Sequence, residues 1–217
     1  MSKPYHKLYL IRHGESEGNV DHRAYDGVLD SNIPLTEIGK GQSTQCGLGL
    51  NEQISPWGAT DVFVTPYLRG RQTWEGIHEG LSGKVLDNIE NIIEDPRIRE
   101  HEYRGKLGGF EFSQIREMRD QGRFFYRFEG GESMADCYDR TSSFLMDRIE
   151  GSGRVYDRKG VIVSHGTAIR TLMMRLLDWT VDDYLRYHTP KNCSIIELTC
   201  NETGVWSWTS GTIKERP

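Results

Sequence analysis

The sequence predicts an α/β fold with a largely parallel sheet, and the main observation is a set of three short apolar runs. Leu8–Ile11, Val62–Val64 and Val161–Val163 each end abruptly at a polar cluster. Short continuous apolar runs of this kind are typical of strands buried on both faces, as in a parallel sheet. Helical patterns lie between the runs, and the alternation of strand and helix is typical of α/β layer folds.

Two helices are predicted around the third apolar run. Apolar residues recur at near-helical spacing over Met134–Ile149. Ser133 precedes that stretch, and Asp136 follows three residues later, as in a capping box. A wide apolar stripe over Ile169–Leu177 predicts a helix directly after the third run.

The rest of the chain completes the α/β pattern. Thr180 with Asp183 is a cap signal for another helix, and Ser194–Thr199 and Val205–Trp208 are typical of strands. No repeat, low-complexity tract or Pro/Ser-rich linker divides the 217 residues. We therefore expect one domain covering residues 1–217, long enough to bury a proper core.

Composition excludes several classes of function. Lys and Arg number 27 against 32 Asp and Glu, so the formal net charge is 27 − 32 = −5. No global basic field is available for nucleic acid or an acidic membrane, and the apolar runs are far too short for a membrane span. Four scattered cysteines without a C-x-x-C pattern are interpreted as reduced thiols in a cytoplasmic protein.

A candidate phosphate site follows the first apolar run. His13 is a candidate nucleophile, since a neutral imidazole attacks phosphorus well when its other ring nitrogen is held as a donor. Arg12 offers a planar fork to phosphate oxygens. Gly14 permits a sharp turn or a close approach to a ligand.

A second histidine stands in the same setting. His165 follows the third apolar run and precedes Gly166, where a helix is predicted to begin. A helix N-terminus favours anions. A lone histidine is more often a satisfied core residue, but two in equivalent positions favour function.

Two further clusters are weaker signals. Arg69 and Arg71 follow the second apolar run, and either could face a pocket while the other stays in solvent. The charged stretch Pro96–Glu102 supplies carboxylic acids of the kind that protonate a leaving alkoxide. Taken alone, the arginines would be solvated charges and the stretch an ordinary loop.

Together these clusters resemble the histidine phosphatase superfamily, the phosphoglycerate mutase-like family. The similarity runs from about Tyr9 to about Leu198. The motifs that carry it, in chain order, are Arg12-His13-Gly14-Glu15-Ser16 with Asn19, Pro34-Leu35-Thr36 with Gly39 and Gln42, Thr65-Pro66-Tyr67-Leu68-Arg69 with Gln72-Thr73, Ile98-Arg99-Glu100, Gly131-Glu132-Ser133 with Asp136, and Ser164-His165-Gly166. The combination is highly specific, although each piece alone is not.

The resemblance implies a three-layer sandwich with helices on both faces of the sheet, and it implies a role for each pocket residue. His13 would be the phosphorylated nucleophile and Glu100 the proton donor. The substrate, through its phosphate group, would be bound by Arg12, Asn19, Arg69, His165 and Gly166. Two arginines and one histidine supply positive charge and hydrogen bonds around a transferring phosphoryl group without a metal.

The sequence departs from the family pattern after the acid. Family members usually have glycine four residues after the glutamate, whereas this chain has Arg104 there and Gly105 next. Either Arg104 replaces the glycine or one residue is inserted, so Glu100 and Glu102 are alternatives for the acid. Arg97–Glu100 matches the upstream pattern directly, which favours Glu100.

The resemblance leaves three functions open. The segment Gly122–Phe128, followed by Gly130–Ser133, looks like the broad phosphatase-like branch of the family, which implies a phosphomonoesterase with a small phosphorylated substrate. A phosphoglycerate mutase-type phosphotransferase is the first alternative. The second is a catalytically weak protein that binds phosphorylated ligands. Relatives that only bind usually lack a core residue, whereas this chain has Arg12, His13, Arg69 and His165, which disfavours the second alternative.

Neither a metal nor a nucleotide cofactor is expected. The remaining histidines have no metal-ligand spacing, and Gly80–Val85 is too short for a P-loop. The residues do not name the substrate, and no heptad pattern indicates an oligomer.

Overall fold

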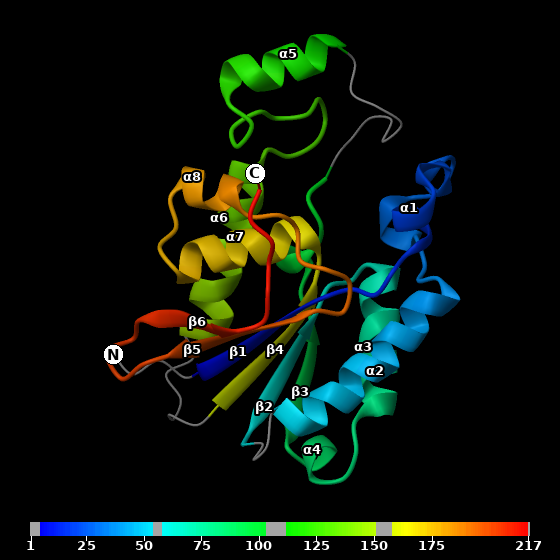
Figure 1. Cartoon of the computed structure of the whole chain (residues 1–217), viewed down its shortest axis with the longest axis vertical. Coiled ribbons are helices and arrows are strands. Elements are labelled where there is room, and N and C mark those ends of the chain that lie inside the picture. The colour runs from blue at the N-terminus through cyan, green and yellow to red at the C-terminus, as the bar shows by residue number, and fades with distance from the viewer. Residues whose placement is uncertain (1–4, 54–57, 103–111, 151–157, 217) are drawn as a thin grey trace.

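The computed structural model describes residues 5–53, 58–102, 112–150 and 158–216, and its centre is a six-stranded sheet (Figure 1). Its strands are β1 (Tyr5–Arg12), β2 (Thr60–Val64), β3 (Ile89–Glu94), β4 (Arg158–Ser164), β5 (Ile195–Cys200) and β6 (Trp206–Ser210). Their order across the sheet is β3-β2-β4-β1-β5-β6. The first four are mutually parallel, while β5 and β6 are antiparallel to their neighbours.

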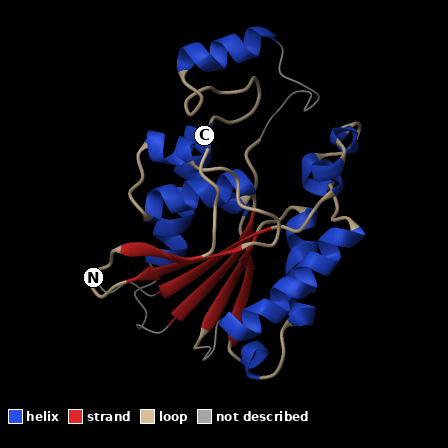
Figure 2. Ribbon diagram, viewed as in Figure 1, coloured by secondary structure: helices blue, strands red, loops and turns tan. Residues whose placement is uncertain are grey.

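Helices cover both faces of the sheet, which confirms the predicted α/β sandwich (Figure 2). The helical elements are α1 (Glu17–Val20), η1 (His22–Tyr25), η2 (Asp30–Asn32), α2 (Glu37–Gln53), α3 (Leu68–Gly80), α4 (Lys84–Asp87), η3 (Pro96–Ile98), α5 (Phe112–Gln121), α6 (Met134–Phe144), η4 (Leu145–Glu150), α7 (Gly166–Leu176) and α8 (Val181–Arg186). Helices α2 and α3 pack on one face, and α6 and α7 pack on the other.

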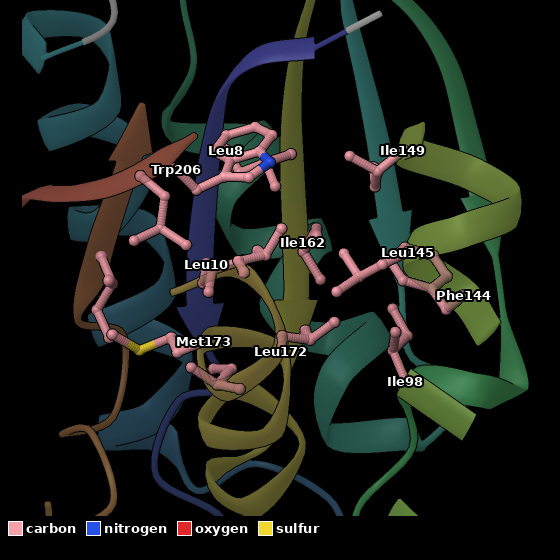
Figure 3. Packing of buried hydrophobic residues seen from close by; sticks show 14 of the residues in the cluster. Leu8, Leu10, Ile98, Phe144, Leu145, Ile149, Ile162, Leu172, Met173 and Trp206 are labelled. Carbon is pink, nitrogen blue, oxygen red and sulfur yellow. The ribbon is translucent and has the colours of Figure 1, made fainter. Parts of the chain in front are cut away.

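Strand β1 shows why the central runs are apolar without interruption. Successive side chains of a strand point to opposite faces, and both faces of this strand are covered. Leu8 and Leu10 pack in the cluster beneath α6 and α7, which Figure 3 shows at close range. Tyr9 and Ile11 pack in the opposite cluster, with α2 and α3.

Two elements differ from the sequence expectation. The edge strand β3 was not predicted, because most of its side chains are partly or fully exposed and it therefore lacks an apolar run. The helix expected over Met134–Ile149 ends at Phe144 and continues as the π-helical turn η4, in which Leu145 and Ile149 remain buried. Arg104 and Gly105, which raised the question of the acid, lie outside the described residues.

No helix in the described stretches is both long and apolar enough to cross a membrane.

Candidate active site

The pocket lies where three parallel strands end side by side. The register pairs Arg12 of β1 with Ser164 of β4, and Val64 of β2 with Val163 of β4. The hydrogen bond from His13 N to Ser164 O, at 2.9 Å, continues the ladder by one residue. The carboxyl ends of β1, β2 and β4 therefore bring together the polar residues that follow them, as is usual in α/β sheets.

His13 is held as a neutral imidazole with one defined proton. Its side chain is 3% exposed. Nδ1 lies 2.7 Å from the carbonyl oxygen of Gly14, which can only accept, so Nδ1 carries the hydrogen and Nε2 has a free lone pair. Burial, reinforced by the charges of Arg69 and Arg12, lowers the pKa of His13 well below 6.5. The residue thus meets the requirement for a nitrogen nucleophile.

His165 lies beside His13, with 5.1 Å between the two ring centroids. It is fully buried at the N-cap of α7, and Nε2 is 2.9 Å from the hydroxyl of Thr65. Within the described residues, Nδ1 has no hydrogen-bond partner. Burial, followed by the charge of Arg69, lowers the pKa of His165 well below 6.5. Both histidines are therefore uncharged at neutral pH.

Two arginines supply the positive charge of the pocket. Arg12 Nη1 donates to the carbonyl oxygen of Pro190 at 2.8 Å. Arg69 is 3% exposed, and its Nη1 donates to the carbonyl oxygen of Asp30 at 2.6 Å. The guanidinium carbon of Arg69 also lies 5.0 Å from the ring centroid of Tyr67. Arg71 is exposed, so Arg69 is the arginine that faces the pocket.

Glu100 follows η3 and reaches the start of α7. Its Oε1 accepts from the backbone N–H groups of His101, at 2.9 Å, and Thr167, at 3.2 Å. The negative charge of Glu100 also opposes the lowering of the Arg12 pKa that burial causes. Glu102 instead binds Glu132 through its backbone, and its N–H donates to Oε2 at 3.1 Å. The hydrogen bond of Glu100 to the start of α7 and its electrostatic effect on Arg12 favour it over Glu102 as the acid.

The guanidinium group of Arg140, which is largely shielded from solvent, holds the segment that carries Glu100. Arg140, on α6, donates to the carbonyl oxygens of Arg97, Arg99 and Glu100 at 2.7, 2.9 and 3.1 Å. It also binds both carboxylate oxygens of Glu132, at 2.9 and 3.0 Å. This planar guanidinium fixes both the backbone before the acid and the loop before α6.

Asn19 is linked to the backbone of His13 by Asn192, a residue that the sequence did not single out. Asn19 Oδ1 accepts from Ser16 N at 3.2 Å and from Asn192 Nδ2 at 3.1 Å. The same amide nitrogen of Asn192 donates to the carbonyl oxygen of His13 at 2.9 Å. Asn192 lies just before the antiparallel strand β5, and only the strand order, which the sequence does not reveal, places it beside β1.

Gly14 lets the loop after His13 approach α2 closely. A Cβ at this position would stand 2.5 Å from the carbonyl oxygen of Gly39, so no larger residue fits without movement. The N–H of Gly14 donates to Thr73 Oγ1 at 3.0 Å, and that hydroxyl donates to Arg69 O at 2.6 Å. Thr73 thereby links the loop of the nucleophile to the helix that carries Arg69.

The arrangement suits an anion and a nucleophilic nitrogen. Both arginines act electrostatically on His13, the neutral imidazole of His165 lies beside it, and Gly166 opens α7. Among the described residues, no group of three or more His, Cys, Asp or Glu side chains could hold a metal ion. Preorganised positive charge of this kind is what phosphoryl transfer requires.

Comparison with known proteins identifies a family model and relatives to which the chain is similar. A family model described as the histidine phosphatase superfamily (branch 1) matches residues 8–210. The phosphoglycerate mutase-like protein AT74H of Arabidopsis thaliana is 34% identical, over 93% of this chain and 76% of its own length. The broad-range acid phosphatase DET1 of Saccharomyces cerevisiae is 24% identical, over 90% of this chain and 86% of its own length.

A solved structure shows the same fold. A mycobacterial glucosyl-3-phosphoglycerate phosphatase in complex with VO3 has a TM-score of 0.66 and 22% sequence identity to this chain. The match covers 94% of this chain and 98% of the other. At this identity the likeness concerns the fold alone.

Proposed function

This chain belongs to the histidine phosphatase superfamily, branch 1, and from that premise we propose that it is a phosphomonoester hydrolase acting through a phosphohistidine on His13. The family includes phosphatases and mutases and acts on small phosphorylated substrates. The observation that carries the proposal is the state of His13. It is buried, its pKa is lowered by burial and by the charges of Arg69 and Arg12, and its Nδ1–H donates to the carbonyl oxygen of Gly14.

In the first half-reaction, His13 Nε2 attacks the phosphorus atom while the bond from phosphorus to the ester oxygen breaks. Glu100, as the carboxylic acid, gives its proton to the departing alkoxide. Arg12 and Arg69 neutralise the charge on the three equatorial oxygens. In this mechanism the Thr65 hydroxyl, 2.9 Å from His165 Nε2, is assigned as the donor, so that the Nδ1–H of His165 is available to a phosphate oxygen.

In the second half-reaction, water attacks the phosphohistidine. The Glu100 carboxylate accepts a proton from that water, the bond between phosphorus and Nε2 breaks, and inorganic phosphate leaves. The pocket then returns to its starting state. Asn19 and Gly166 are proposed to contact the bound phosphate. No step draws on a metal ion, so the proposed hydrolase is metal-independent.

Release of phosphate from p-nitrophenyl phosphate, with and without EDTA, tests the proposal. Wild type should release phosphate in both conditions, and His13→Ala should lose activity by roughly a thousandfold or more. The exposed His188 is the control, since His188→Ala should keep wild-type activity. Failure of wild type on this ester and on a panel of phosphorylated metabolites would overturn the proposal. Rapid interconversion of 3- and 2-phosphoglycerate would indicate a mutase instead.

A further inference from the structure

An acidic side chain is bound to one of the two pocket arginines. Asp30 Oδ1 lies 2.9 Å from Arg69 Nη1, the same nitrogen that donates to the Asp30 carbonyl oxygen. Oδ1 is buried, and among the described residues no N–H group points at it with good geometry, so this contact is an ion pair more than a hydrogen bond. One N–H of Nη1 is therefore used by the Asp30 carbonyl oxygen, and the Asp30 carboxylate lies against the guanidinium group that is proposed to bind the phosphate.

The carboxylate of Asp30 remains accessible from one side. Its side chain is 30% exposed, whereas that of Arg69 is 3% exposed. The charges that act most strongly on Asp30 are Arg69 itself, then Glu100 and Glu102. Two tyrosines, Tyr25 and Tyr67, also lie within its electrostatic reach. Among the described residues whose charges act most strongly on Asp30, Arg69 is thus the cation, and Glu100 and Glu102 are carboxylates.

Asp30 must lie close to the substrate that Arg69 binds. A phosphate oxygen hydrogen-bonded to another nitrogen of the same guanidinium would be about 3 Å from it. The carboxylate and the phosphorus atom would then be separated by roughly 5 to 7 Å. Asp30 repels the phosphate itself in every substrate, and Arg69 offsets that repulsion. A second anionic group near the ester would also be repelled by Asp30. Neither Arg69, which pairs with the phosphate, nor the carboxylates of Glu100 and Glu102 would offset that repulsion.

We propose that Asp30 determines substrate class: it favours phosphomonoesters whose carbon skeleton carries hydroxyl groups next to the ester and rejects those that carry a second negative charge there. A carboxylate can accept hydrogen bonds from hydroxyl groups, and it repels another carboxylate or phosphate at this range. The inference rests on the proposed hydrolase function and specifies which esters the pocket accepts.

A matched pair of esters isolates this effect. Glycerol 3-phosphate and 3-phosphoglycerate share a skeleton and differ in one group, a hydroxymethyl in the first and a carboxylate in the second. At about pH 8, wild type should prefer glycerol 3-phosphate by about tenfold or more in kcat/KM. Asp30→Asn keeps the shape and removes the charge, so it should reduce that preference by about tenfold.

Asp26→Asn is the control, because Asp26 is an exposed aspartate in the segment that leads into η2, the element that contains Asp30. It makes the same change in net charge and should leave the preference at its wild-type value. Equal wild-type activity on both esters would overturn the inference. It would also be overturned if Asp30→Asn and Asp26→Asn had the same preference as wild type.

A binding measurement distinguishes failure of this inference from failure of the proposed function. In a His13→Ala background, calorimetric titration with each ester gives the ratio of the two dissociation constants. The ratio should favour glycerol 3-phosphate, and adding Asp30→Asn should bring it towards one. If wild type hydrolyses no ester, the proposed function fails while this ratio still decides the role of Asp30. A ratio that Asp30→Asn does not change would refute that role.

Discussion

At the scale of single residues, burial and nearby arginines keep both pocket histidines uncharged. Both lose solvation inside the pocket, and the positive charge of Arg69 further disfavours a proton on either ring. The same charge attracts a phosphate. The pocket therefore prepares a neutral nucleophile and an anion site with the same arginine, and neither histidine needs to be deprotonated before reaction.

This has a consequence for stability against pH. In the unfolded chain a histidine takes up its proton near pH 6.5, whereas His13 and His165 remain neutral in the folded protein to lower pH. Below about pH 6.5 the unfolded state therefore binds more protons. The free energy of unfolding should decrease as pH falls, by up to about 1.4 kcal/mol per pH unit for each histidine.

Urea denaturation at several pH values between about 7.5 and 5.5 measures this slope. His13→Gln removes one titrating group and should make the decrease shallower. An equally steep decrease in His13→Gln would show that His13 is not held neutral by its surroundings.

The sequence predicted individual pocket residues to different degrees. Arg12 ends β1, and His13 and His165 directly follow β1 and β4, so their position at the sheet edge could be inferred from the apolar runs. Asp30 begins the short helix η2 and Asn192 lies in the loop before β5, and the place of both segments depends on tertiary contacts. No local pattern marks them, and only the folded chain brings them to Arg69 and His13.

At the scale of elements, glycines allow α2 and α3 to pack closely behind the pocket. A Cβ on Gly47 would overlap the carbonyl group of Ile77, and a Cβ on Gly80 would overlap that of Thr44. Because α3 carries Arg69 and α2 supports the loop after His13, their separation fixes the two halves of the pocket. The sequence predicted helical patterns between the apolar runs but gave no sign of this close approach.

Two substitutions on the same helix test the close packing. Gly47→Ala should destabilise the protein by about 1 to 3 kcal/mol, since the backbones must separate. Gly41→Ala is the control: Gly41 lies on the exposed side of α2, and apart from its chain neighbours and the adjoining backbone of α2, no described atom lies within 4 Å of the added Cβ. Gly41→Ala should stabilise by roughly 0.5 to 1 kcal/mol through helix propensity. Chemical denaturation measures both, and equal effects would contradict the packing argument.

At the scale of the whole molecule, the sheet order explains how distant segments form one pocket. Strand β4 lies between β1 and β2, so residues that follow three separate strands meet at one edge. The largely parallel sheet could be predicted because buried strands have a distinctive apolar pattern. The exposed edge strand β3 and the π-helical turn η4 could not, since neither has a pattern that differs from a loop or an ordinary helix.

Some expectations for the whole chain stay predictions. These are a single domain over residues 1–217, a cytoplasmic location and the absence of a cofactor. The family and the fold are confirmed by the family model and the solved relative. The residue roles in the pocket remain proposals that the experiments above address.

Trapping the phosphorylated enzyme tests the central claim most directly. Wild type is mixed briefly with a phosphomonoester carrying radioactive phosphate and is then quenched in alkali, where phosphohistidine survives. The label should be acid-labile, should map to His13 by mass spectrometry, and should be absent from His13→Ala. Label on any other residue, or none while phosphate is being released, would contradict a mechanism through phosphohistidine on His13.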